Sequence, residues 1–198
     1  MEEDYSMNHL IVFTHPDKNS FNGALLERYG SELQKKGHNV KIRDLYRLNF
    51  YPALSREEYL ESFNGKYKED VKIEHSFIDW SDIITFINPI WWAGIPALTK
   101  GYMDRIFSYG FAYTLDKGTP VPLLGEKKAI TIFTGGQPEN LYRENGMLKS
   151  MRQIIEEGLF EFCGLQNAGS LYFGNIIMAS NEERKEMLDG LGVFANQF

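Results

Sequence analysis

The stretch from Ile83 to Tyr113 reads IITFINPIWWAGIPALTKGYMDRIFSYGFAY. Its opening run, Ile83–Ile87, is β-branched or aromatic throughout, which is typical of a strand buried on both faces of a parallel sheet. A proline ends the run, two tryptophans follow, and Pro96 predicts a helix start, because its missing N–H is harmless there. Ligands of open α/β sheets bind on the loops that follow the carboxyl ends of strands. Trp91 and Trp92 on such a loop therefore indicate a flat, aromatic ligand.

The rest of the chain alternates strands with helices around this stretch. Beside Ile83–Ile87, the predicted strands are 9–14, 40–45, 127–134 and 167–173, and the predicted helices are 22–36, 55–63, 74–81, one from 96, 146–162 and 180–196. Segments 46–54, 64–72 and 116–125 are predicted to be irregular or exposed. This alternation predicts an α/β fold with a doubly wound, five-stranded parallel sheet of order 2-1-3-4-5. We expect one domain over residues 1–198, with residues 1–6 as a loose tail.

Composition narrows the class of protein. The net charge of −6 argues against nucleic acid or an anionic membrane as the main partner. Insertion into a membrane is not expected, because no apolar run reaches the roughly 20 residues that span a bilayer. One cysteine, Cys163, precludes an internal disulfide, and the acidic N-terminus is unlike a secretory signal, so we expect a cytoplasmic protein. No Cys/His spacing indicates a metal site.

Three loops should meet at one edge of the predicted sheet: 15–22, 89–94 and 134–142. The first loop runs into a helix N-terminus, where free N–H groups and the helix dipole favour an anion. Ser20 and Asn22 can hydrogen-bond phosphate oxygens, and His15 can add a donor. Simple capping of the helix by Ser20 or Asn22 explains the pattern equally well. The loop is neither a Walker loop nor a G-x-G-x-x-G turn.

The other two loops carry aromatic residues and glycines. Trp91 and Trp92 can flank a planar ring, or they can be core or interface aromatics. Gly135 and Gly136 let backbone amides approach a ligand closely, or they form a plain tight turn. Tyr142 and Asn145 further along can reach the same place. Cys163 is interpreted as a buried small hydrophobe rather than a nucleophile.

Short motifs from His9 to Phe173 recur in an order and spacing that together are specific. They are His15 with Ser20-Phe21-Asn22; Asp44-Leu45-Tyr46 with Asn49-Phe50; Pro89, Trp92 and Gly94 with Pro96-Ala97; Lys100-Gly101, Arg105 and Phe107; Phe111-Ala112-Tyr113-Thr114; Thr134-Gly135-Gly136; and Phe162-Cys163-Gly164. In these motifs the chain resembles the NAD(P)H:quinone oxidoreductases of the DT-diaphorase type and their short bacterial relatives with a flavodoxin-like fold.

The resemblance implies a tightly held flavin, a homodimer, and ping-pong hydride transfer from NAD(P)H to quinones, with nitro or azo compounds as further acceptors. It also assigns residues to four places. The flavin phosphates would be held by His15, Ser20, Phe21 and Asn22; the isoalloxazine lined by Pro89, Ile90, Trp91, Trp92 and Ala93; its pyrimidine side bonded by Thr134, Gly135 and Gly136; and the pocket for nicotinamide and quinone lined by Gly94, Tyr113 and Phe162.

The same resemblance makes Tyr142 and Asn145 the expected catalytic residues. Donors at the N1–C2=O edge of the ring would stabilise the negative charge that hydride transfer leaves there. Asn145 stands where the family has a histidine, and it can donate a hydrogen bond but cannot titrate. Trp91 replaces a glutamine and Ala93 an aromatic residue, so quinone specificity does not transfer.

Two features of the sequence bear on whether the flavin is FAD or FMN. Asp104 matches an acidic position near the adenosine half in FAD-binding members, which favours FAD over FMN. The absence of the long C-terminal extension of the eukaryotic enzymes favours FMN.

Two alternatives remain open at this point. A one-electron carrier like flavodoxin would have a Ser/Thr-Gly phosphate loop, which this chain lacks, and would not need the Phe111–Tyr113 wall. A flavin-loaded regulatory subunit of a membrane transporter would keep the same motifs.

Overall fold

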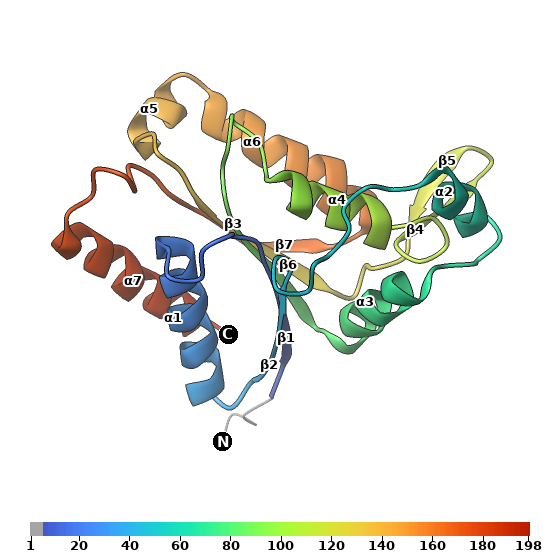
Figure 1. The fold of residues 1–198 in the computed structure, drawn as a ribbon, viewed down its shortest axis with the longest axis horizontal. Coiled ribbons are helices and arrows are strands. Elements are labelled where there is room, and N and C mark those ends of the chain that lie inside the picture. Colours follow the sequence, from blue (N-terminus) through green and yellow to red (C-terminus); the bar gives the residue numbers. More distant parts are fainter. Residues whose placement is uncertain (1–5) are drawn as a thin grey trace.

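A computed structural model describes residues 6–198 and contains one five-stranded parallel sheet of order β2-β1-β3-β6-β7 (Figure 1). Of the predicted loose tail, residues 1–5 lie outside the described residues. The Ser6 hydroxyl donates a hydrogen bond of 2.9 Å to the carbonyl oxygen of Gly37. The strands are β1 (Asn8–Phe13), β2 (Asn39–Asp44), β3 (Ile83–Pro89), β6 (Lys128–Thr134) and β7 (Gln166–Phe173).

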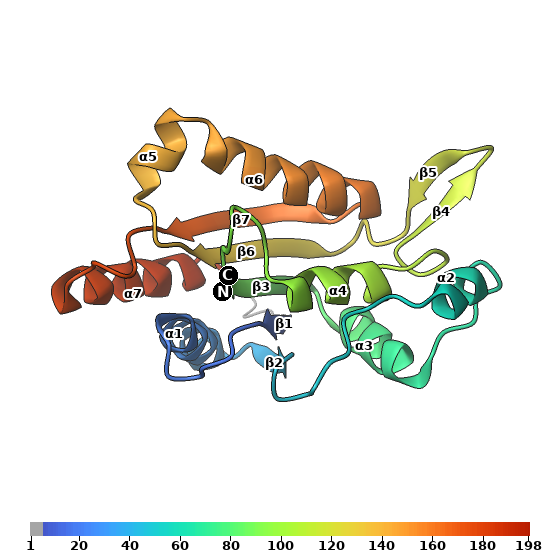
Figure 2. The same ribbon diagram turned by 45° about the horizontal axis from the view of Figure 1, so that its top comes forward.

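Helices cover both faces of the sheet, as the alternation predicts (Figures 1 and 2). One face packs against α1 (Phe21–Lys35) and α7 (Asn181–Ala195). The other packs against α3 (Glu69–Trp80), α4 (Ala97–Ile106), and α6 (Met147–Ile155) with the π-helix η1 (Glu156–Glu161) that continues it. Two short helices, α2 (Arg56–Ser62) and α5 (Glu139–Glu144), lie at opposite ends of the molecule.

The stretch that decides the fold forms the central strand. All residues of β3 are buried, and they alternate between the two cores. Ile83 and Ile87 pack with α1 and α7, whereas Ile84 and Phe86 pack with α3, α4 and α6. The prediction of a strand buried on both faces is confirmed.

A hairpin was missed. Segment 116–125 was predicted to be loop, but β4 (Tyr113–Asp116) and β5 (Thr119–Pro122) form an antiparallel pair there. The hairpin turns at Lys117 and Gly118, both with positive φ (50° and 86°), as a two-residue turn requires. Its prolines are tolerated because a two-stranded hairpin has two free edges. These two strands are counted as β4 and β5 but lie outside the main sheet. The main sheet therefore has the order β2-β1-β3-β6-β7 in place of the predicted 2-1-3-4-5.

The helices differ from the prediction in three ways. Helix α3 begins at Glu69, inside the segment predicted to be exposed, and its acidic first turn is the signal that was missed. Helix α5 lies in the predicted loop after residue 134. The predicted helix 146–162 changes from α to π hydrogen bonding after Ile155.

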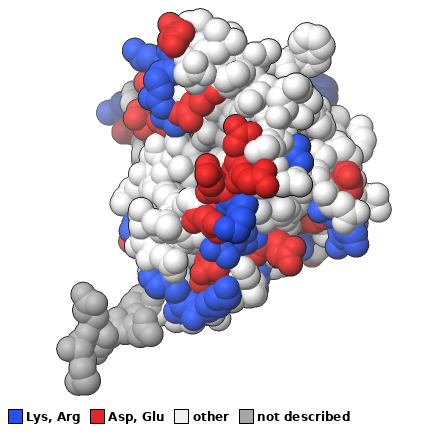
Figure 3. Space-filling view, turned by 90° about the vertical axis from the view of Figure 1, so that its left-hand side faces the viewer, with Lys and Arg blue, Asp and Glu red and all other residues white. Residues whose placement is uncertain are grey.

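The surface beside α1, α5 and α7 carries charges of both signs, interspersed with uncharged areas (Figure 3). Arg28 of α1 pairs with Asp189 of α7 at 3.8 Å across the two helices. None of the helices among residues 6–198 is long and apolar enough to cross a bilayer.

His9, near the amino end of β1, is completely buried. Its ring centroid lies 5.2 Å from that of His38 and 5.8 Å from that of Phe198. Within residues 6–198 neither ring nitrogen has a hydrogen-bond partner. Burial, reinforced by His38, lowers the pKa of His9 from 6.5 to about 4, so the folded protein keeps this ring neutral.

We expect this histidine to make folding sensitive to acid. His9 is protonated near its ordinary pKa of 6.5 in the unfolded chain, but only near pH 4 in the folded chain. The contribution of neutral His9 to the free energy of unfolding is therefore complete above pH 6.5 and is lost as the pH falls toward 4. Between about pH 7.5 and about pH 5 this amounts to roughly 2 kcal/mol. Urea unfolding of His9→Leu and of the parent at both pH values should show the stability difference shifting by that amount in favour of the variant at low pH. A difference that is independent of pH would contradict this account.

Candidate functional site

The loops that follow β1, β3 and β6 meet at the carboxyl edge of the sheet, as predicted. They enclose a cavity of about 430 Å³, here called the loop cleft. A ligand pocket typically measures 300–1,000 Å³, so a molecule of cofactor size fits. The cleft is lined by His15, Ser20, Phe21, Asn22, Pro89, Ile90, Trp91, Trp92, Thr134, Gly135, Gly136, Ile176 and Ile177. The prediction therefore brought together eleven of these residues and missed only the last two, from the loop after β7.

The first loop is held in one shape before any ligand arrives. Ser20 is the N-cap of α1 and accepts a hydrogen bond of 3.3 Å from the N–H of Gly23. The carbonyl of Lys18 lies so close to Gly23 that any side chain there would overlap it. The helix leaves the N–H groups of Phe21 and Asn22 without intrahelical partners. Both the capping and the anion-binding interpretation of this loop are therefore compatible with the structure, since the cap uses only one amide.

Asn22 and Thr134 connect the first loop to the third. The Nδ2 atom of Asn22 donates a hydrogen bond of 2.8 Å to Oγ1 of Thr134, and both residues are buried. The Oδ1 atom of Asn22 has no protein partner within the described chain. An unpaired buried carbonyl is costly, so this oxygen is well suited to accept an N–H or O–H from a ligand in the loop cleft.

The second loop is a strained two-residue turn. Trp91 and Gly94 exchange backbone hydrogen bonds of 2.9 and 3.0 Å, while Trp92 and Ala93 between them have φ of 52° and 58°. Left-handed backbone costs a residue with a side chain about 1 kcal/mol or more. The indole of Trp92 is fully exposed and that of Trp91 is half exposed. The amides of Trp92 and Ala93 are not used by the turn's own pair of bonds and can face a ligand.

The third loop packs tightly against β7. The N–H of Gly135 donates to the carbonyl of Phe173 at 2.9 Å, so this amide is not free for a ligand. A side chain at Gly135 would collide with the hydroxyl of Tyr172. Burial raises the pKa of Tyr172 to about 12, and its hydroxyl donates to the carbonyl of Gln137. Glycine at 135 is thus required for close packing, while Gly136 is the exposed one of the pair.

Tyr142 and Asn145 do not line the loop cleft. Tyr142 is half-buried on α5, with its ring centroid 5.8 Å from that of Tyr172. Asn145 is exposed at the end of α5, and its Oδ1 accepts a hydrogen bond of 3.0 Å from the N–H of Met147. Their catalytic role stays a prediction.

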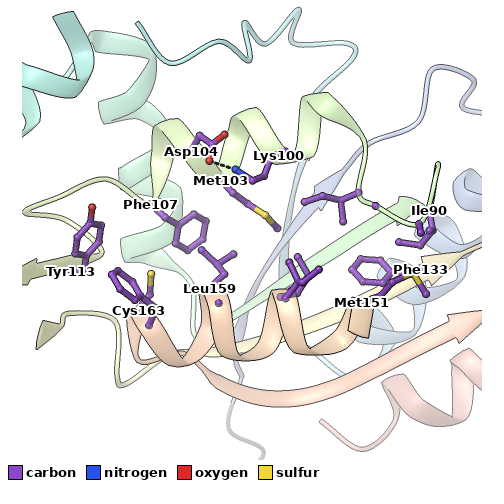
Figure 4. A pocket seen from close by; sticks show the side chains of 17 residues that line it. Ile90, Lys100, Met103, Asp104, Phe107, Tyr113, Phe133, Met151, Leu159 and Cys163 are labelled. Carbon is purple, nitrogen blue, oxygen red and sulfur yellow. Dashed lines mark hydrogen bonds and ion pairs between the residues drawn. The ribbon is translucent and has the colours of Figure 1, made fainter. Parts of the chain in front are cut away.

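A second cavity, here called the long groove, runs between α4 and the α6–η1 helix (Figure 4). It measures about 620 Å³ and is mostly apolar. Its charged lining groups in the described chain are Lys100 and Asp104, which pair with each other. Ile90 lies at one end, and Tyr113 and Cys163 lie at the other. The remaining lining residues are Ala93, Gly94, Ile95, Met103, Phe107, Phe133, Met151, Ile154, Ile155, Gly158, Leu159 and Phe162.

The three residues predicted to line one substrate pocket, Gly94, Tyr113 and Phe162, all line this groove, and Tyr113 lies at the end far from Ile90 (Figure 4). Gly94 and Ala93 belong to the strained turn, whereas the ring of Tyr113 packs edge-on against Phe162, 4.8 Å between centroids. Burial raises the pKa of the Tyr113 hydroxyl, which stays protonated at neutral pH. Cys163 is buried as predicted, and burial raises its thiol pKa to about 12, which makes it a poor nucleophile.

Comparisons with known proteins agree with this geometry. A family model described as flavodoxin-like fold matches residues 7–192. An NAD(P)H oxidoreductase of Haemophilus influenzae, described as uncharacterized, is 42% identical over 184 residues, covering 92% of this chain and 91% of the relative. NAD(P)H dehydrogenase [quinone] 1 of Cavia porcellus is 35% identical over 79% of this chain and 64% of its own length.

Two solved structures are also similar. NAD(P)H:quinone oxidoreductase from Methanothermobacter marburgensis superposes with a TM-score of 0.89 at 31% identity, covering 96% of this chain and 98% of the other. An FMN-dependent NADH-azoreductase from Bacillus anthracis, in complex with FMN, shares the fold with a TM-score of 0.74, covering 96% of this chain and 98% of the other at 15% identity.

The strained turn gives a testable expectation. Ala93→Gly should raise the free energy of unfolding of the ligand-free protein by about 1 kcal/mol, because glycine adopts positive φ without the steric cost. The control is Ala24→Gly inside α1, where the same change should destabilise by roughly 0.5–1 kcal/mol. Denaturant unfolding of both variants measures the effects. Equal losses in the two variants would show that the turn stores no strain.

Proposed function

The chain belongs to the flavodoxin-like fold family that contains NAD(P)H:quinone oxidoreductases, and we propose that it is itself a flavin-dependent enzyme that transfers two electrons from NAD(P)H to quinones. We propose azo compounds as a second class of electron acceptor, because a protein of the same fold is named an azoreductase. The observation that carries the proposal is the meeting of three loops, an anion-binding helix start, a tryptophan pair and a glycine pair, in one cleft of cofactor size.

The residues of the loop cleft fit a flavin. The amides of Phe21 and Asn22 at the start of α1, with the Ser20 hydroxyl, suit the phosphate end. Trp91 and Trp92 suit the planar ring, and the unpaired Oδ1 of Asn22 provides a buried acceptor. His15 also lines the loop cleft, and its ring centroid lies 6.4 Å from that of Trp91.

A bound flavin supplies the redox chemistry, accepting a hydride from NAD(P)H and returning two electrons to the acceptor. The protein's part is to hold the ring against the strained turn and to place donors where negative charge develops. We assign the turn amides and Gly136 to the ring edges. Tyr142 is assigned the hydroxyl donor at the pyrimidine edge, with Asn145 beside it. This role requires α5 to approach the cleft, and as far as the structure describes it, α5 has no buried residue to anchor it.

The identity of the flavin is a separate question. Asp104, the basis for expecting FAD, is partly exposed in the long groove and pairs with Lys100. The FMN-dependent relative from Bacillus anthracis shares the fold and holds FMN, and the compared names give no support to FAD. The preference for FAD over FMN is therefore not supported. A cytoplasmic location remains part of the proposal.

A homodimer would account for the spread of the predicted substrate-pocket residues along the long groove. Tyr113 is far along the groove from Ile90 (Figure 4). In a dimer with two-fold symmetry, the same surface of both subunits forms the interface, and the two copies run in opposite directions across it. Two copies packed groove to groove would therefore bring Tyr113 and Phe162 of one chain to the Ile90 and Gly94 end of the other. The apolar lining of the groove, including the 67% exposed Ile154, fits such an interface.

We expect the purified holoprotein to be yellow and to lose its visible flavin absorbance on anaerobic mixing with NADH or NADPH, regaining it when menadione is added. Tyr142→Phe should slow this bleaching by roughly 10- to 1,000-fold at unchanged flavin content, because an oxyanion-type donor acts on the charge that develops during transfer. Stopped-flow absorbance measures both. The oxidoreductase proposal fails if neither nucleotide bleaches the flavin. Equal rates in variant and parent would remove Tyr142 from the mechanism.

The dimer gives a further expectation. Ile154→Asp should convert the protein to monomers and abolish quinone reduction, because each substrate pocket needs Tyr113 from the second copy. The matched control is Val193→Asp on α7, which changes an equally exposed side chain (68%) away from the groove. Sedimentation velocity gives the mass of each variant. A dimeric Ile154→Asp variant, or a fully active monomer, would contradict the proposed interface.

A further inference from the structure

His75 lies in the middle of α3 and lines neither the loop cleft nor the long groove of the described chain, yet it is 6% exposed and makes specific contacts. Its Nε2 atom is 2.9 Å from the carbonyl oxygen of Ile106. A carbonyl can only accept, so Nε2 carries the proton and donates. Ile106 is the last residue of α4, where helix carbonyls lose their intrahelical partners, so His75 satisfies one of them.

The same Nε2 atom of His75 also lies 3.3 Å from Oγ of Ser108, and the imidazole contacts two aromatic rings. Its imidazole lies face to face on Phe111, with 3.6 Å between ring centroids and 11° between planes. The ring of Tyr67 meets the imidazole edge-on, with 4.7 Å between centroids, and its hydroxyl donates to the carbonyl of Tyr109 at 2.8 Å. Aromatic pairs left to themselves prefer offset or edge-on contacts. The stacked geometry is therefore attributed to the other contacts of the imidazole, with Ile106, Ser108 and Tyr67.

Phe111 belongs to the tight turn that carries Tyr113. Within this turn the N–H of Ala112 donates to the carbonyl of Ser108 at 3.0 Å, and the N–H of Gly110 donates to the carbonyl of Tyr113 at 2.7 Å. Gly110 has a φ of 80°, which allows the chain to reverse there. The turn is thus internally bonded, and its position relative to α3 is set by its side chains.

We propose that His75 is a positioning residue that holds the Ser108–Tyr113 turn, and with it the Tyr113 ring, in place for the acceptor. The inference deepens the proposed function and rests on it, because Tyr113 matters only if it lines the substrate pocket. Precise placement of a substrate-contacting ring needs a second layer of contacts that locks it. The stack on Phe111 provides that lock, while the hydrogen bond to Ile106 orients the imidazole and contributes mainly to stability.

Two substitutions separate the ring from the hydrogen bond. His75→Gln keeps an N–H donor and removes the ring, while His75→Phe keeps a ring and removes the donor. We expect His75→Gln to raise KM for menadione about five- to tenfold with little change in kcat and in flavin content. His75→Phe should stay within about twofold of the parent in KM and should lose stability, because the Ile106 carbonyl is left unpaired. His38→Gln is the matched control, since His38 is a similarly buried histidine far from Tyr113.

Two readouts distinguish this inference from failure of the proposed function. In a Tyr113→Ala background, His75→Gln should no longer change KM by more than about twofold, because both changes act through one ring. In flavin-free protein, amide exchange of residues 108–113 should be at least about tenfold faster in His75→Gln than in the parent or His38→Gln. Unchanged exchange and unchanged KM would overturn the role of His75. A parent protein that reduces no quinone, with exchange altered as expected, would overturn the function and leave the anchoring of the turn intact.

Discussion

Both faces of β3 are covered by helices, and every residue of the strand is buried. A strand in this position cannot satisfy its backbone except by pairing on both sides, and it pairs in parallel with β1 and β6. Parallel pairing places the carboxyl ends of all three strands at one edge. The loops that leave this edge have to share a small space, and they bring the helix start, the tryptophans and the glycines together. The site is therefore a consequence of how the core is built.

The loops at this edge are rigid in different ways. Asn22 and Thr134 cross-link two of them through one buried hydrogen bond. The turn at Trp92 and Ala93 keeps its shape against a backbone cost. Such strain persists only where surrounding contacts determine it, and it presents exposed indoles and free amides to the cleft. In contrast, α5 carries Tyr142 on a helix without buried residues among those described. The loops that line the cleft are thus held by specific contacts, whereas α5 lies beside the cleft with its Tyr142 only partly buried.

Much of this arrangement was predictable from the sequence, because it rests on local signals. Apolar runs indicated the three central strands, β1, β3 and β6. The glycines, prolines and tryptophans after them indicated the loops that form the cleft. The hairpin after Tyr113 was missed, since its prolines argue against strands unless the strands have free edges. The tertiary details were also beyond prediction. Neither Trp92 nor Ala93 favours positive φ, and nothing local couples His75 to Phe111 or Asn22 to Thr134. The apolar pair Ile176 and Ile177, next to a strand end, was a usable signal that was overlooked.

The central claim is that the three loops form one flavin site in each chain. It is tested most directly by heating the purified protein, identifying the released chromophore by mass, and measuring its amount per chain. We expect one flavin for each chain, as FMN or FAD. Protein that is folded but releases no flavin, and takes up neither FMN nor FAD when they are added, would contradict it.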